Sequence, residues 1–302
     1  MSGERTLVVG AHGFLGLAIV SALAESGSAP VGLVRSPDHS EAVRRAGGEP
    51  ALGRLEDRAS VARAAAGCRA IVHVASVSGG ETDDWSAARR VRVEGARTLA
   101  RIAGEAGADR LVIGSGYWVY ASCPGTLTDD AALDPRGESR VNFEAEEAAL
   151  GAAPSGLDVL IVRPGMVYGD GSWFRGMVEA VRSGGYPLPA PGTNLWSLIE
   201  RSDAARAFAT VLERGRPGDA YLAVDDVPIP VGDLVALVAA HLGVPPPESR
   251  TADELVRAVG PDVAYHLSAN RAGSNARLRA LGWAPRTPDP REGVVRLLRT
   301  MR

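Results

Sequence analysis

The chain has 302 residues, of which 45% are hydrophobic and 23% charged, and its formal net charge is −3 at pH 7. These values are ordinary for a soluble globular protein with one large domain and a smaller companion, and they exclude the strongly basic character of a nucleic-acid-binding protein. All 33 basic residues are arginine, so no mechanism that needs a lysine amine can operate.

The two cysteines, Cys68 and Cys123, form no C-x-x-C pair and lie in no cluster with histidine, so we expect neither a disulfide framework nor a metal site. The N-terminal residues lead directly into a strand without a signal peptide, and no apolar run approaches the roughly 18 residues of a membrane span. We therefore expect a cytoplasmic protein with no membrane or nucleic-acid partner.

Strands and helices alternate through the first half of the chain. Short apolar runs predict six strands, at residues 6–9, 30–34, 49–52, 70–75, 110–115 and 157–162. Helices are predicted between them, at residues 15–27, 57–67, 84–106 and 140–150. Because the strands are almost continuously apolar, we expect a parallel sheet buried on both faces, that is, a doubly wound α/β Rossmann fold.

Beyond Gly165 the pattern changes. Prolines and glycines concentrate between residues 165 and 193, which indicates irregular structure. A helix at residues 203–214 and one more strand at 219–224 are predicted next, then helices at residues 231–242, 252–259, 274–281 and 291–302. We expect a dinucleotide-binding domain at residues 1–165, and a mixed region at 166–302 that completes the sheet and forms a smaller, mostly helical substrate domain.

Three glycines at the first strand-to-helix junction predict a cofactor site. Gly10, Gly13 and Gly16 directly follow the first strand and open an amphipathic helix, and in that context their spacing is typical of a turn that holds a pyrophosphate. Phe14 and Leu15 complete the turn, so their backbone is expected to meet the phosphates at the helix N-terminus.

The end of the second strand indicates which nucleotide is bound. An NAD-specific turn usually has an acidic residue about 20 residues after the glycines, whereas this chain has Arg35. A guanidinium pairs well with a 2′-phosphate, so NADP is the expected cofactor, with His12 as a second contact. Asp38 leaves NAD open, and the alternative for Arg35 and His12 is a solvated side chain.

Seven short motifs follow one another along the chain: Gly10-x-x-Gly13-x-x-Gly16, Val72-His73-Val74-Ala75, Val93-Glu94-Gly95, Gly114-Ser115-Gly116-Tyr117-Trp118-Val119-Tyr120, Arg163-Pro164-Gly165, Ser274-Asn275-Ala276-Arg277 and Leu281-Gly282-Trp283-Ala284-Pro285. In order and spacing they resemble the extended short-chain dehydrogenase/reductase group, the NAD(P)-dependent epimerase/dehydratase family. The last two resemble its dihydroflavonol-reductase-like members. The resemblance covers nearly the whole chain and implies a Rossmann fold with a nicotinamide cofactor. Relatives often pair through the long helices after the fourth and fifth strands, so a homodimer is one expected arrangement.

The resemblance does not extend to the catalytic residues. In the family, a serine or threonine after the fifth strand and a Tyr-x-x-x-Lys pair in the next helix move the proton while hydride is transferred. Here Gly116 stands at the serine position, with Ser115 one residue earlier, and Glu138 and Asn142 stand at the tyrosine and lysine positions. The chain is therefore an atypical member by resemblance, and its mechanism has to be inferred from its own residues.

Tyr117 and Ser115 are the candidate catalytic residues, because both lie just after the fifth strand, at the sheet edge where open α/β folds bind ligands. Tyr117 is expected to protonate the product while Ser115 donates a hydrogen bond. The alternative is that Tyr117 only packs over the nicotinamide or the substrate. The carboxylates of Glu144, Glu146 and Glu147 are expected on a solvated helix face, and His73 in the core.

Further contacts are expected from residues near the same sheet edge. The expected cofactor contacts are Ala75, Ser76, Asn142 with its neighbour Arg140, and Arg163, for which a structural role is the alternative. The expected substrate contacts are Ser78, Tyr120, Val167, Trp173, Phe174 and Trp196. The aromatic side chains among them favour an apolar, aromatic or polyketide-like ligand, unless they only tie the small domain to the sheet.

These features predict an NADPH-dependent reductase of a hydrophobic small molecule, with a place in secondary metabolism. Two alternatives remain open. One is a non-redox isomerase, cyclase or dehydratase that retains the nucleotide, and the other is a non-catalytic protein that senses NADP(H).

Overall fold

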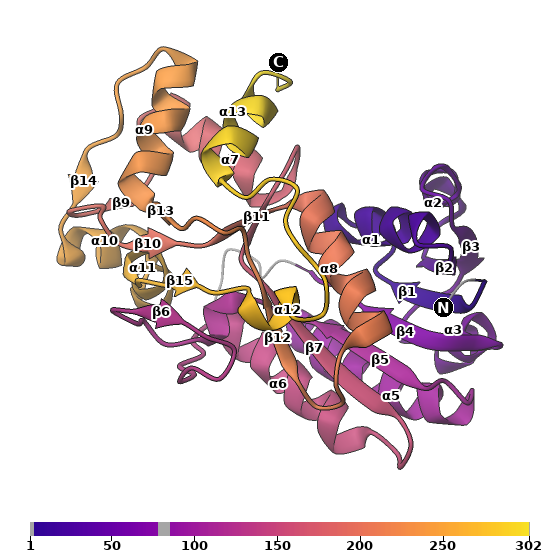
Figure 1. Cartoon of the computed structure of the whole chain (residues 1–302). Coiled ribbons are helices and arrows are strands. Elements are labelled where there is room, and N and C mark those ends of the chain that lie inside the picture. The colour runs from indigo at the N-terminus through magenta and orange to yellow at the C-terminus, as the bar shows by residue number, and fades with distance from the viewer. Residues whose placement is uncertain (1–2, 78–84, 302) are drawn as a thin grey trace.

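A seven-stranded parallel sheet forms the centre of the computed structural model, which describes residues 3–77 and 85–301 (Figure 1). Along the sheet the strands are β12 (Ala220–Ala223), β7 (Asp158–Pro164), β5 (Arg110–Gly114), β4 (Cys68–His73), β1 (Arg5–Val9), β2 (Ala29–Val34) and β3 (Glu49–Leu52). The order reverses direction at β1, whose neighbours are β4 and β2, as in a Rossmann fold. The predicted fold class is confirmed, and the seventh strand joins the sheet from the second half of the chain.

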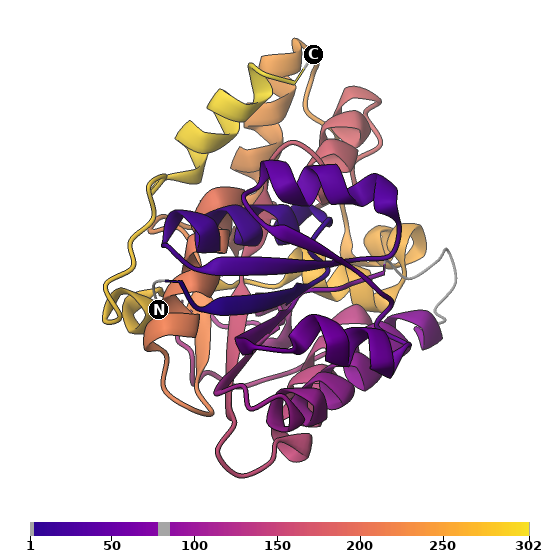
Figure 2. The ribbon, with the colours of Figure 1, turned by 90° about the vertical axis from the view of Figure 1, so that its right-hand side faces the viewer.

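Helices cover both faces of the sheet, as Figure 2 shows along a second direction. Helices α1 (Phe14–Glu25) and α8 (Arg201–Arg214) pack on one face, against side chains such as Val8, Val72 and Val112. Helices α3 (Arg58–Ala65), α5 (Gly95–Glu105) and α6 (Glu138–Ala152) pack on the other, against their neighbours Leu7, Ile71 and Leu111. Successive residues of a strand point to opposite faces, so two apolar layers require strands that are apolar throughout.

The helix after β4 is not continuous. The sequence predicts one helix at residues 84–106, but the structure has α4 (Ser86–Arg89), a π-helical segment labelled η2 (Arg90–Glu94) and then α5. A π-turn takes in an extra residue, so the side chains before and after it lose the common phase of an α-helix. Arg92 lies within this segment and lines the large cavity described below.

Residues 165–193 contain a helix that the sequence analysis missed. Helix α7 (Ser172–Arg182) places Phe174, Met177, Val178 and Val181 at helical spacing, and all four are buried. Its flanking glycines and prolines concealed this pattern, and the prediction of irregular structure there was wrong.

The C-terminal region has a core of its own around α7 and α9 (Val231–Leu242). Its other helices are α10 (Ala252–Val259), α11 (Pro261–Ser268), α12 (Ala276–Arg279) and α13 (Pro290–Leu298). Short strand pairs connect the region: β8 (Met166–Tyr168) with β11 (Leu198–Glu200), β10 (Leu195–Trp196) with β13 (Ile229–Pro230), β9 (Leu188–Pro189) with β14 (Ser249–Arg250), and β6 (Thr126–Leu127) with β15 (Ala272–Gly273). Among the described residues, no helix combines the length and apolar character needed to cross a membrane.

Candidate functional site

The glycine turn between β1 and α1 is shaped so closely that only glycine fits. Gly10 has φ +95°, and a Cβ there would lie 2.6 Å from the backbone N of Ala75. A Cβ on Gly16 would lie 2.0 Å from the carbonyl oxygen of Gly10. The turn closes through a 3.0 Å hydrogen bond from the N–H of Gly13 to the same oxygen. Two of the three glycines are therefore needed for the backbone path itself.

The N-terminus of α1 is free to bind an anion. Its N-cap, Gly13, has no side chain, and the N–H groups of Phe14, Leu15 and Gly16 have no acceptor among the described residues. Unpaired N–H groups and the positive end of the helix dipole together form a site for a phosphate group. These residues thus fit the pyrophosphate of a dinucleotide.

A cavity of about 750 Å³ runs from this turn across the carboxyl ends of β4 and β5 to the C-terminal region. Most of the residues predicted from the sequence line it: Gly10, His12, Gly13, Phe14, Leu15, Gly16, Arg35, Ala75, Ser76, Ser115, Tyr117, Asn142, Val167 and Trp173. Trp118 also lines it and was not predicted; its indole stacks on His266, with ring centroids 4.7 Å apart. The structure therefore brings the predicted nucleotide and catalytic residues into one space.

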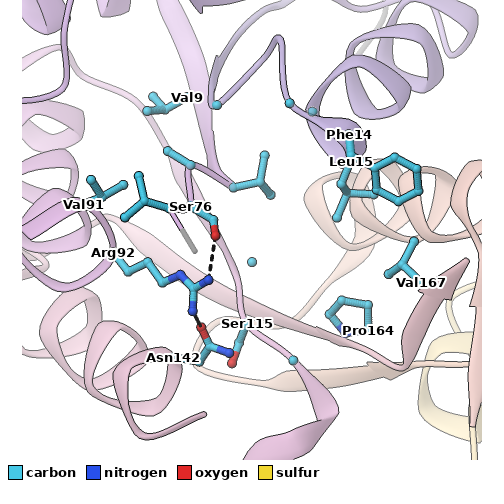
Figure 3. Close-up of a pocket in the computed structure, with 18 of the residues that line it drawn as sticks. Val9, Phe14, Leu15, Ser76, Val91, Arg92, Ser115, Asn142, Pro164 and Val167 are labelled. Atoms are coloured by element: carbon cyan, nitrogen blue, oxygen red, sulfur yellow. Dashed lines mark hydrogen bonds between the residues drawn. The ribbon is translucent and has the colours of Figure 1, made fainter. Parts of the chain in front are cut away.

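Arg92 is the central polar group of the cavity, and the sequence analysis missed it. Its Nη1 donates to Asn142 Oδ1 at 2.7 Å, and its Nη2 donates to Ser76 Oγ and to Glu138 Oε1, both at 2.6 Å. Figure 3 shows the guanidinium between Ser76 and Asn142. Both residues at the positions where the resemblance implies tyrosine and lysine, Glu138 and Asn142, thus bind one arginine. The only sequence feature that could have pointed to Arg92 is the motif next to it, Val93-Glu94-Gly95.

Ser115 and Tyr117 present two hydroxyl groups without hydrogen-bond partners. Tyr117 is 1% exposed, and neither Ser115 Oγ nor Tyr117 Oη has a partner among the described residues. Burial raises the pKa of Tyr117 to about 12, although the nearby Arg271 guanidinium acts in the opposite direction. Tyr117 therefore keeps its proton at neutral pH, and both groups are available as donors to a ligand.

Three predicted substrate contacts lie in the core instead of the cavity. Tyr120 is fully buried and its hydroxyl donates to the carbonyl oxygen of Asp129 at 2.9 Å. Phe174 packs among the apolar side chains of α7, and Trp196 is 1% exposed, with its ring centroid 6.5 Å from that of Trp118. Their assignment as substrate residues is therefore corrected. The sequence alone does not distinguish an aromatic residue that packs in the core from one that lines a cavity. Ser78 lies outside the described residues.

Arg163 is a structural residue and not a cofactor contact. Its Nε and Nη2 bind the two carboxylate oxygens of Glu146, at 3.0 and 2.6 Å, and both side chains are buried. The expectation that Glu146 lies on a solvated face is wrong for the same reason. Arg140 is exposed and does not line the cavity, whereas His73 is buried as expected.

The chain is similar to known NAD(P)H-binding proteins and reductases. A family model described as NAD(P)H-binding matches residues 10–214. A Streptomyces protein named 3-diazoavenalumate denitrifying reductase is 32% identical over 97% of this chain and 99% of its own length. A protein of Stigmatella aurantiaca, named 4-hydroxy-2-methyl-3-oxo-4-farnesyl-3,4-dihydroquinoline-1-oxide ketoreductase, is 28% identical over 80% of this chain and 74% of its own.

Solved structures have the same fold. A human epimerase family protein with NADPH superposes with a TM-score of 0.80, at 20% identity over 99% of this chain and 100% of that one. A dTDP-glucose 4,6-dehydratase from Streptomyces venezuelae, with NAD bound, superposes with a TM-score of 0.81, at 23% identity over 98% and 96% of the two chains.

Proposed function

Because the chain belongs to the NAD(P)H-binding family, as an atypical relative of the extended short-chain dehydrogenases/reductases, we propose that it is an NADPH-dependent reductase of a hydrophobic small molecule. The observation that carries the proposal is the single cavity that joins the glycine turn to an aromatic end formed by Tyr117, Trp118 and Trp173. When bound, NADPH supplies the hydride. Reductases among the relatives support the same direction of reaction.

In this proposal the nucleotide is held at two places. The free N–H groups of Phe14 and Leu15 bind the pyrophosphate. Arg92 and Asn142 hold the nicotinamide ribose: the guanidinium has five donor hydrogens, and its hydrogen bonds to Asn142, Ser76 and Glu138 leave two for a ligand. Arg92 is held by Ser76, which follows β4, and by Glu138 and Asn142 of α6. It therefore fixes the nicotinamide end of the nucleotide relative to the substrate.

The substrate is proposed to lie against Tyr117, Trp118 and Trp173, with its polar group toward Ser115. Both unpaired hydroxyls, of Ser115 and Tyr117, donate to that group and are satisfied only when it is bound. For a carbonyl substrate, Tyr117 then gives its proton to the developing alkoxide, a strong base, so a tyrosine with a pKa of about 12 is still an effective donor.

The test is turnover with NADPH deuterated stereospecifically at C4, over a panel of aromatic ketones, aldehydes and enones. Deuterium in the product at one face supports reduction. Turnover of substrate without net NADPH consumption would instead support the non-redox isomerase, and NADPH binding without turnover would support the sensor. The matched control is Gly16→Val, in which the side chain collides with Gly10 and nucleotide binding should be lost.

A second candidate reaction is hydride transfer to a diazonium group, and the missing Tyr-x-x-x-Lys pair favours it. The relative from Streptomyces is named for a diazo substrate and for loss of nitrogen. Conversion of an aryldiazonium ion to the arene takes up one hydride and releases dinitrogen, and no proton is consumed. A site that lacks the usual proton-transfer pair suits such a substrate, because its electrophile is already cationic.

Tyr117→Phe distinguishes the two reactions. With a carbonyl substrate the variant should lose about 10²-fold or more in kcat, because the proton donor is removed. With a stable arenediazonium salt it should retain activity within about threefold. Reactions without enzyme are needed as controls for direct chemical reduction. If neither class of substrate is reduced, the proposed activity is wrong even where NADPH binds.

A further inference from the structure

Two histidines lie face to face at the end of the cavity formed by the glycine turn and β2. His12, in the turn, and His39, in the short 3-10 helix η1 (Pro37–His39), have ring centroids 4.0 Å apart and planes 7° from parallel. The Nδ1 atom of each ring is buried and has no partner among the described residues. Buried ring nitrogens normally have partners, so this pair indicates a site whose ligand completes it.

Charged groups of both signs lie near the pair. Arg35, at the end of β2, lines the cavity with His12. The nearby acidic groups are Asp38, which accepts a 3.0 Å hydrogen bond from Ser36 Oγ, and Glu56, which lines the cavity after β3. Burial, and then His39 and Arg35, lower the pKa of His12 below its ordinary value, so the free protein favours the uncharged form of this imidazole.

We propose that His12 binds the 2′-phosphate of NADP(H) together with Arg35, that His39 holds the His12 ring by stacking, and that binding takes up one proton. The proposal rests on the NADP(H) preference proposed above and adds a positioning residue and a proton to it. A phosphate dianion beside an imidazole stabilises the imidazolium form, and stacking on His39 holds the His12 ring where it can meet the phosphate.

NAD(H) provides the contrast. It carries a hydroxyl where NADP(H) carries the phosphate, so it brings no charge to His12 and should bind without proton uptake. Affinity for NADPH should therefore rise as pH falls from 8 to 6.5, by up to about tenfold per pH unit for one proton. Below about pH 6 the phosphate itself becomes protonated, and the rise should end. Affinity for NADH should change less than about twofold over the same range.

The experiment is titration calorimetry of the full chain with NADPH and NADH at pH 7, in Pipes and in Tris. These buffers differ in ionisation enthalpy, so the difference in apparent binding enthalpy gives the number of protons taken up. The expected values are 0.5 to 1 proton for NADPH and none for NADH. Equal uptake for both nucleotides, or none for NADPH, would overturn the proposal.

Variants separate the roles of the two rings. His12→Gln should abolish proton uptake and weaken NADPH binding about tenfold while leaving NADH binding unchanged. His39→Phe keeps an aromatic ring for stacking and should retain proton uptake, whereas His39→Ala should lose most of it. His241→Gln is the control, since His241 is exposed on α9. Equal behaviour of His39→Phe and His39→Ala would disprove the stacking role.

The outcomes also separate this inference from the proposed function. If NADPH binds and is consumed without proton uptake, the reductase proposal stands and only the histidine pair is misassigned. If neither nucleotide binds, both proposals fail together.

Discussion

Arg92 Nη1 lies 2.7 Å from Asn142 Oδ1, so the residue at the position of the family's lysine holds a cation instead of being one. The chain has no lysine, yet the cavity has a positive group at its centre, anchored through Ser76, Glu138 and Asn142. A guanidinium has a fixed fork of donors and remains charged at any working pH, so it is suited to holding and orienting hydroxyl groups. It is not suited to acting as a proton donor.

Arg92→Met should therefore lower kcat about 10- to 100-fold and raise KM for NADPH, because the nicotinamide ribose loses its anchor and the hydride its alignment. Arg92→Lys keeps the charge but not the fork, so an intermediate loss is expected. Steady-state kinetics with the best substrate of the panel would measure both.

The control for Arg92 is Arg90→Met, in the same π-helical segment. Arg90 is exposed and does not line the cavity, so this variant should keep kcat and KM within about twofold. Equal loss in the two variants would mean that the segment as a whole is fragile and that Arg92 has no specific part.

Arg35→Asp should reverse the preference between the two nucleotides. An aspartate at the end of β2 accepts hydrogen bonds from ribose hydroxyls and repels a 2′-phosphate. The ratio of kcat/KM for NADPH to that for NADH should fall about 100-fold or more, by a loss with NADPH and a gain with NADH. Arg44→Asp, on α2 (Ser40–Arg45), is the control for a change of surface charge. An unchanged ratio in Arg35→Asp would remove Arg35 from the site.

The frame of this site was predictable and its interior was not. The glycines after β1 and the arginine after β2 are each recognised from a few neighbouring residues. The nucleotide-binding turn could therefore be predicted from the sequence alone. Arg92 could not be placed, because a π-turn changes which side chains point inward. The pairing of Glu146 with Arg163 joins two elements and leaves no local pattern. Phe174 and Trp196 show that aromatic content alone does not separate core from cavity.

Breaking the Glu146–Arg163 ion pair should destabilise the fold, because the partner that remains is a buried charge without a counter-charge. Glu146→Ala removes both acceptors of a buried guanidinium and should lower the free energy of unfolding by about 3–5 kcal/mol. The double change Glu146→Leu with Arg163→Met leaves no charge and should restore much of that loss. Urea denaturation followed by circular dichroism measures both.

Glu147→Ala is the control for the α6 helix, since Glu147 is exposed, and it should change stability by less than about 0.5 kcal/mol. If Glu146→Ala were as mild as Glu147→Ala, the ion pair would have no measurable structural role. If the double variant stayed as unstable as Glu146→Ala, packing rather than charge would explain the effect.

Asp225, just after β12, should make the protein less stable as pH rises. It is 2% exposed, and neither carboxyl oxygen has a hydrogen-bond partner among the described residues. Burial, and then the nearby Asp203, raise its pKa to about 9. Between pH 4 and 9 the folded state therefore keeps a proton that the unfolded state releases, and the free energy of unfolding falls with rising pH. Asp225→Asn replaces the protonated carboxyl with a neutral group of the same shape, so it should equal the parent in stability near pH 4 and be more stable by several kcal/mol at pH 8, since each pH unit between the two pKa values costs about 1.4 kcal/mol. Urea unfolding at both pH values measures the difference, with Asp253→Asn, at an exposed position in the first turn of α10, as the control. A variant that is less stable than the parent at pH 8 would mean that the Asp225 carboxylate is ionised and bound in the fold.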